Sequence, residues 1–220
     1  MTRLTPIVLT ALTLALAAGT AHAADATSKA VTPPKPDAKA DAALAKVIQE
    51  SFVSKGPATV EGVTERDDVQ KICSQFADRN AVPAAVAKKL EDAQLKTIHY
   101  PADNKWLGDW KEGEKTAQSG RGMQFSDPAG GANGANCYAC HRLSKDEVSY
   151  GTIGPSLYQY GKLRGDSEAI MRYTWGKIYN SNAYAACSNM PRFGHKGILT
   201  EQQIRDVMAL LFDPASPVNQ

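Results

Sequence analysis

The pentapeptide Cys137-Tyr138-Ala139-Cys140-His141 constrains this 220-residue chain more than any other feature. Two thiols separated by two residues can each form a thioether with one vinyl group of a haem, and the adjacent histidine can ligate the iron. A zinc site would need a second ligand pair at similar spacing, and a redox dithiol would need a βαβ surround; neither pattern accompanies the segment. The sequence therefore predicts one covalently bound haem c, attached to Cys137 and Cys140, with His141 as an axial ligand.

The sixth iron ligand has four candidates downstream of His141. Met171 and Met208 fall on apolar helical faces, which favours core packing. Met190 lies in a polar loop 49 residues after His141, a separation that lets the chain return on the far face of a haem. We predict Met190 as the ligand, with His195 and an open iron site as the alternatives. Histidine–methionine ligation raises the reduction potential and fills the coordination sphere, which suits electron exchange.

Pro155 follows the pentapeptide within Gly154-Pro155-Ser156-Leu157. An axial histidine usually donates its free ring N–H to a carbonyl, and a proline presents its carbonyl from a fixed backbone. We expect Pro155 to accept this bond from His141; the alternative is an ordinary turn.

The N-terminal residues indicate export from the cytoplasm. Arg3 precedes an apolar run over residues 6–18, and Ala21-His22-Ala23 offers a small-x-small cleavage site. Residues 1–23 are expected to be a signal peptide that is cleaved after Ala23, because the run is shorter than the roughly 20 residues of a membrane span. The mature protein would be periplasmic. A formal charge of +2 without a basic cluster predicts no nucleic-acid or membrane partner.

The sequence after residue 23 predicts an all-α protein with three parts: a linker, a helical extension and a second domain. Residues 24–40, rich in Ala, Lys, Pro and Asp, suit a flexible linker. Apolar residues at helical spacing predict a helical extension over 41–104 and a second domain over 105–220. The expected helices lie near residues 44–52, 67–76, 83–95, 106–120, 166–180 and 199–211. The helix near 106–120 should open at Trp106 and carry Gly113 at a close packing contact, and Thr200 with Gln203 suits a capping box.

The chain has four cysteines, and two of them, Cys73 and Cys187, lie outside the haem-attachment pentapeptide. In an oxidising compartment an even remainder favours a disulfide, which would tie the helical extension to the loop that carries Met190. A redox-active Cys187 thiol near the haem is the alternative reading.

Several motifs together resemble SoxX, the monohaem c-type cytochrome subunit of the sulfur-oxidation complex SoxAX. The resemblance covers most of the mature chain, including the helical extension with its Cys73, and is strongest after Trp106. The motifs are Gly108-Asp109-Trp110, Gly113-Glu114, the pentapeptide, Gly151-Thr152-Ile153-Gly154-Pro155-Ser156-Leu157, Cys187-Ser188-Asn189-Met190-Pro191-Arg192-Phe193-Gly194 and Asp213-Pro214-Ala215-Ser216-Pro217-Val218-Asn219. The order of helix, pentapeptide, proline turn, methionine loop and terminal helix also resembles class I cytochromes c. This resemblance implies a class I cytochrome c domain with an N-terminal helical extension.

The resemblance to SoxX also implies an activity and partners. It implies a heterodimer with SoxA that conjugates thiosulfate oxidatively to a cysteine of the carrier SoxYZ, the reaction of L-cysteine S-thiosulfotransferase. The catalytic site would belong to SoxA and no catalytic residue to this chain, which would pass electrons to a soluble cytochrome c. Tyr138 and Arg192 are candidates for exposed residues on the partner-facing surface. The rival functions are a free-standing electron carrier and a ligand-binding or peroxidase-like protein with an open iron.

Overall fold

The computed structural model describes residues 38–76, 78 and 81–220, and all regular elements in this part are helical. The predicted signal peptide and most of the predicted linker lie outside the described residues. The helices are α1 (Ala38–Ser51), α2 (Val60–Thr64), α3 (Asp68–Cys73), α4 (Ala84–Leu95), α5 (Trp110–Gln118), α6 (Tyr160–Arg164), α7 (Glu168–Tyr179) and α8 (Glu201–Phe212), with 3₁₀ turns at Ser181–Ala183 and Pro217–Asn219. The prediction of an all-α fold is confirmed.

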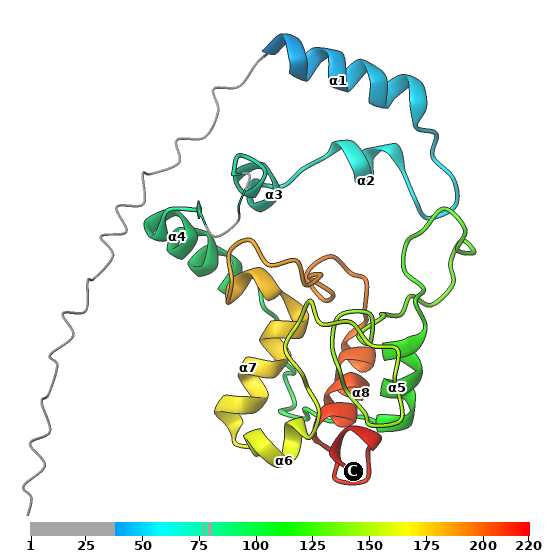
Figure 1. Cartoon of the computed structure of the whole chain (residues 1–220), viewed down its shortest axis with the longest axis vertical. Coiled ribbons are helices and arrows are strands. Elements are labelled where there is room, and N and C mark those ends of the chain that lie inside the picture. Colours follow the sequence, from blue (N-terminus) through cyan, green and yellow to red (C-terminus); the bar gives the residue numbers. More distant parts are fainter. Residues whose placement is uncertain (1–37, 77, 79–80) are drawn as a thin grey trace, which may run out of the picture.

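Helices α5 and α8 pack directly against each other and lie side by side in the lower part of the view (Figure 1). A Cβ atom built on Gly113 would lie 2.0 Å from the backbone oxygen of Asp206, so only glycine permits this approach. The Asp206 carboxylate also accepts the Asp109 N–H at 2.9 Å. The packing contact expected at Gly113 is thus a helix–helix contact.

The helix that contains Gly113 starts later than its sequence pattern predicted. Asp109 caps α5 by accepting the Lys111 N–H, so the helix begins at Trp110 rather than at Trp106. Trp106 instead packs edge-to-face on Trp175, with ring centroids 5.9 Å apart. Its apolar character reflects this tertiary contact, which helical spacing alone could not distinguish from a position on the helix.

The terminal helix α8 supplies the largest buried face. Thr200 caps it in the predicted capping box with Gln203, and apolar side chains along its length are buried. Trp175 on α7 is fully buried against this core and donates its indole N–H to the His99 carbonyl at 2.8 Å. Together α5, α7 and α8 form the frame on which the connecting loops lie (Figure 1).

The helical extension divides into a packed part and an exposed part. Val69 on α3 and Leu90 on α4 form a small core with Ala186, in the loop that follows α7. Helix α1 instead buries no residue, and its predicted apolar stripe is exposed, with Leu44 at 56% and Val47 at 55%. The helical spacing was therefore read correctly, whereas the burial that such a stripe usually indicates is absent.

Two short helices had no clear sequence signal. Helix α6 follows Gln159, a non-glycine residue with a positive φ of 56° and no side-chain cap. Helix α2 has five residues, too few for an apolar period to be recognised. Helix α6 packs against α8, whereas α2 is mostly exposed and is capped by the Thr59 side chain, which accepts the Gly62 N–H at 3.1 Å.

Candidate functional site

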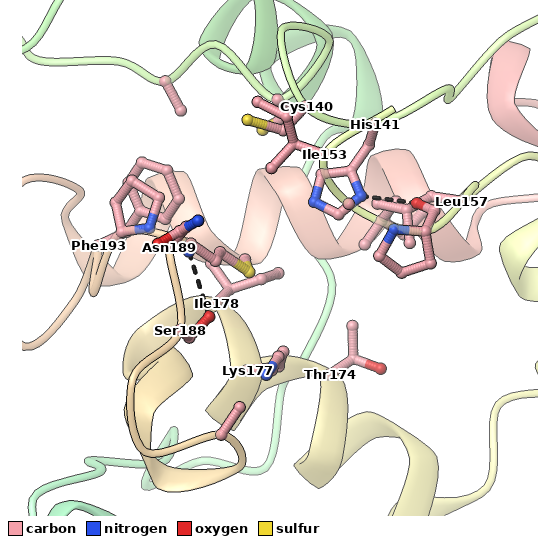
Figure 2. A pocket seen from close by; sticks show the side chains of 18 of the residues that line it. Cys140, His141, Ile153, Leu157, Thr174, Lys177, Ile178, Ser188, Asn189 and Phe193 are labelled. Carbon is pink, nitrogen blue, oxygen red and sulfur yellow. Dashed lines mark hydrogen bonds between the residues drawn. The ribbon is translucent and has the colours of Figure 1, made fainter. Parts of the chain in front are cut away.

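A cavity of about 1070 Å³ opens between the pentapeptide segment and the loop that follows α7. This volume lies slightly above the range of typical ligand and cofactor pockets, which is roughly 300 to 1,000 Å³. Cys137, Cys140 and His141 line one side, and Met190 and Phe193 belong to the opposite loop. Figure 2 shows Cys140 and His141 across the cavity from Ser188, Asn189 and Phe193.

The pentapeptide forms a tight turn that follows α5. The Cys137 N–H donates to the Ala117 carbonyl at the end of that helix, and the Cys140 and His141 N–H groups both donate to the Cys137 carbonyl. Cys137 and Cys140 are free thiols that line the same cavity. The turn therefore presents two sulfur atoms and one imidazole to a single space, as thioether attachment with axial ligation requires.

The His141 ring is fixed by Pro155, as predicted for the axial histidine. Its Nδ1 lies 2.7 Å from the Pro155 carbonyl oxygen, a bond marked in Figure 2. A carbonyl can only accept, so Nδ1 carries the proton and Nε2 keeps a lone pair for a metal. The neighbouring Gly154 leaves room for the ring, because a Cβ there would lie 2.2 Å from His141 Cε1. The Gly154 N–H also donates to the Cys140 carbonyl at 2.8 Å, which joins this turn to the attachment segment.

The thiol environment is unsuited to disulfide exchange. Burial, followed by the nearby Cys140 and Glu114, raises the pKa of Cys137 to about 12. Thiol–disulfide exchange requires a thiolate, which such a group does not provide near neutral pH. Nucleophilic attack by Cys137 in a dithiol exchange is therefore disfavoured.

Met190 lies in the loop that follows α7 and lines the cavity. It is half-buried and lines the space that His141 also lines. Its backbone N–H donates to Ser188 Oγ at 3.2 Å, and its carbonyl accepts the Ser181 hydroxyl. Iron ligation by Met190 stays a prediction that this position supports.

The other ligand candidates lie elsewhere. Met171 is 6% exposed and Met208 is fully buried, both within the hydrophobic core, as their helical positions predicted. His195 is half-buried outside the set of residues that line the cavity, and burial, followed by Arg192 and Lys196, lowers its pKa. The backbone N–H of His195 donates to the Tyr179 carbonyl at the end of α7.

Cationic side chains complete the cavity wall. Arg121, Arg164 and Lys177 line it, and burial lowers the pKa of Lys177 despite the opposing field of Glu91. A haem carries two carboxylates, which such cations can neutralise. Two thiols, a metal-ready imidazole, a methionine and cations around one large cavity thus fit a haem c.

Cys73 and Cys187 form a disulfide with Cα atoms 5.7 Å apart, across 114 residues of sequence. This is the pairing that the sequence favoured, and it leaves no free Cys187 thiol for a redox role. The disulfide joins the last residue of α3 to the loop three residues before Met190.

Two expectations about the partner-facing surface were wrong. Tyr138 is 4% exposed, and its hydroxyl donates to the Glu114 carboxylate at 2.9 Å. Arg192 is 8% exposed and pairs with Asp67 at 2.6 Å. Both side chains are turned inward by an acidic partner that sequence inspection could not assign, since Asp67 lies 125 residues before Arg192.

Asp67 is the main residue that the sequence analysis did not connect with the site. The sequence places it only at the start of the helix expected near residues 67–76, whereas in the structure its carboxylate contacts Lys196 at 2.7 Å as well as Arg192. No local signal in the sequence links a helix cap to a distant loop.

Within the described residues, no helix is long and apolar enough to cross a membrane.

Comparison with known proteins relates this chain to a protein family and to a bacterial relative. The family model described as cytochrome c matches residues 129–212, a segment that contains the pentapeptide, Met190 and the whole of α8. An uncharacterized lipoprotein of Aquifex aeolicus (strain VF5) is 35% identical over 168 residues, which is 76% of this chain and 79% of that protein. An alignment of that length exceeds residues 105–220, so it reaches into the helical extension.

Proposed function

We propose that this chain, which belongs to the cytochrome c family, carries electrons through one covalently bound haem c as a subunit of a larger periplasmic enzyme. The cavity that His141 and Met190 line from facing segments is the observation that carries this proposal. When bound, the haem would supply reversible one-electron exchange at its iron. In this proposal the chain is exported to the periplasm, its signal peptide is removed after Ala23, and the haem is attached there.

The residues of the cavity would hold and tune this group. Cys137 and Cys140 would provide thioether attachment, and His141 would be one axial ligand, oriented by the Pro155 carbonyl. A hydrogen bond from the ring N–H to a carbonyl strengthens the imidazole as a ligand. Met190 would occupy the remaining axial position, so that no substrate could reach the metal without displacing a protein ligand.

The specific role that we propose is that of SoxX. The motifs quoted above support it, and so does the disulfide that attaches a helical extension to the methionine loop. In this role the chain would take electrons from a SoxA partner while SoxA joins thiosulfate to a cysteine of SoxYZ. That conjugation forms one S–S bond and releases two electrons and one proton. This chain would pass the electrons to a soluble cytochrome c and would supply no catalytic residue.

Reconstitution tests this division of labour. The purified holoprotein alone should conjugate no thiosulfate to SoxYZ, and addition of SoxA should give turnover with reduction of an added soluble cytochrome c. Conjugation by this chain in isolation would contradict the proposal.

Purification from the native host separates the proposal from its main rival. Size-exclusion chromatography with haem counting should detect a complex with a second haem-bearing chain. A monomer with one haem and no partner would favour a free-standing electron carrier.

A further inference from the structure

The short helix α3 holds the loop that carries Met190 at two points. This Met190 loop comprises residues 184–199. Cys73, the last residue of α3, forms the disulfide with Cys187. Asp67, the N-cap of α3, forms ion pairs with Arg192 at 2.6 Å and with Lys196 at 2.7 Å. The two attachments lie three residues before and two residues after Met190.

We propose that α3 with its cap, residues 67–73, is a clamp that positions Met190 in the haem cavity. This inference rests on the proposed function, in which Met190 is the axial ligand. Asp67, Cys73 and Cys187 act through the loop backbone and are positioning residues. Helix α3 thus has a role in ligation although its sequence lies outside the segment that matches the cytochrome c family.

The Met190 loop has little structure of its own to fix the ligand. It contains no helix or strand, and its own backbone–backbone hydrogen bonds lie in turns before residue 189 and after residue 191. Beyond these turns, Gly194 and His195 both donate to the Tyr179 carbonyl at the end of α7. Among the described residues, segment 189–191 has no backbone–backbone hydrogen bond. Pro191 offers no N–H. Met190 is therefore held at its backbone by Ser181 and Ser188, while its flanks are held by the clamp and, farther along the chain, by the Tyr179 carbonyl.

The clamp has a firm base in the extension. Val69 of α3 packs with Leu90 of α4 and with Ala186, the neighbour of Cys187. Glu91 of α4 accepts the Ala186 N–H at 3.0 Å, and the Asn180 side chain donates to Gln94 and Thr97. The Asn180 bonds join the end of α7 to α4. A movement of the Met190 loop away from the cavity would have to break the Val69–Ala186 packing and the Glu91–Ala186 bond together with the clamp.

The ion pair is the second, non-covalent half of the clamp. Arg192 is nearly buried, so loss of the Asp67 charge leaves a desolvated guanidinium without its counter-ion. Asp67 also caps α3 by accepting the Gln70 N–H at 3.0 Å. Asparagine is an equally good cap, so Asp67→Asn removes the charge and preserves the helix start.

The test uses the oxidised holoprotein and two readouts in a urea titration. The near-infrared thioether-to-iron band reports Met190 ligation, and far-ultraviolet circular dichroism reports helix content. The variants are Asp67→Asn and the double variant Cys73→Ala/Cys187→Ala. In both we expect the band to disappear at a lower urea concentration than the helical signal, whereas in the wild type the two transitions should coincide.

Asp103→Asn is the matched control. Asp103 pairs with Arg205 at 2.8 Å and accepts the Lys105 N–H, so this change also removes a charge and keeps a backbone acceptor, and both partners lie outside the Met190 loop. Its band and helical signal should still be lost together. If the clamp variants also lose the band and the helical signal at the same urea concentration, the clamp is refuted. If the double cysteine variant fails to fold, the Asp67→Asn variant alone decides between these outcomes.

Amide hydrogen exchange distinguishes failure of the clamp from failure of Met190 ligation. If the wild type lacks the band, the proposed ligation is wrong, but the clamp still predicts faster exchange of the Met190, Gly194 and His195 amides in Asp67→Asn. We expect about a tenfold increase, typical of losing one charge-assisted hydrogen bond. Unchanged exchange at these amides would overturn the clamp whatever the ligand.

Discussion

The Nδ1 atom of His141 lies 2.7 Å from the carbonyl oxygen of Pro155, and this contact determines which ring nitrogen faces the cavity. The bond assigns the proton to Nδ1 and leaves Nε2 free to ligate a metal. The acceptor is a backbone atom, so the side chain at position 155 matters less than the space around the ring.

Gly154→Ala should therefore perturb the site more than Pro155→Ala. The added Cβ would overlap the His141 ring and must displace it or the turn. We expect a loss of about 1–3 kcal/mol in the free energy of unfolding. The reduction potential, measured by voltammetry, should also shift. Pro155→Ala retains the carbonyl and should cost about 0.4–1 kcal/mol through the freer unfolded chain. Equal effects of the two changes would contradict this description of the histidine.

The contact between α5 and α8 should be the most sensitive glycine site in the frame. In Gly113→Ala the new methyl group would meet the Asp206 backbone, which cannot move aside as a flexible side chain could. A destabilisation near the upper end of about 1–3 kcal/mol is expected, measured as the urea midpoint at an unchanged m-value. Gly62→Ala is the control, because its Cβ would lie 3.5 Å from the nearest atom, in ordinary contact. A Gly113→Ala protein as stable as the Gly62→Ala protein would be inconsistent with this packing.

The Asp67 ion pairs should make stability depend on pH. Burial alone would raise the pKa of Asp67, but hydrogen bonds from Lys196, the Gln70 N–H and Arg192 outweigh it and hold the pKa well below its usual value of 3.8. Since the folded pKa is lower than the unfolded one, this contribution is present above about pH 4 and declines as the pH falls below it.

Comparison of wild type with Asp67→Asn isolates that contribution. At pH 7 the variant should be less stable by about 1–2 kcal/mol, because a charge-assisted bond is lost at a partly solvated site. The difference between the two proteins should shrink as the pH is lowered from 5 to 3, measured from urea midpoints. A constant difference across this range would show that the carboxylate charge is not responsible.

How far the sequence predicted this structure depends on the range of the signal. The start of α8 was predicted correctly because Thr200 and Gln203 form a capping box within four residues. The pentapeptide likewise places both thiols and His141 by local geometry alone. These features need no knowledge of the remaining fold.

The failures concern contacts between distant residues. Arg192 was expected at the surface, but its orientation is determined by Asp67, 125 residues earlier. Trp106 was assigned to a helix because its spacing to Trp110 is helical, whereas its actual partner is Trp175. The stripe on α1 is periodic yet exposed, since periodicity reports a helix and not the surface that covers it.

Ligation by Met190 is the central claim, and one spectrum tests it directly. The oxidised wild type should show the near-infrared thioether-to-iron band, and Met190→Ala should lose it and bind carbon monoxide readily when reduced. Met123→Ala is the control, because Met123 is an exposed methionine, and it should retain the band. A Met190→Ala protein with an unchanged near-infrared spectrum would contradict the assignment of the sixth ligand.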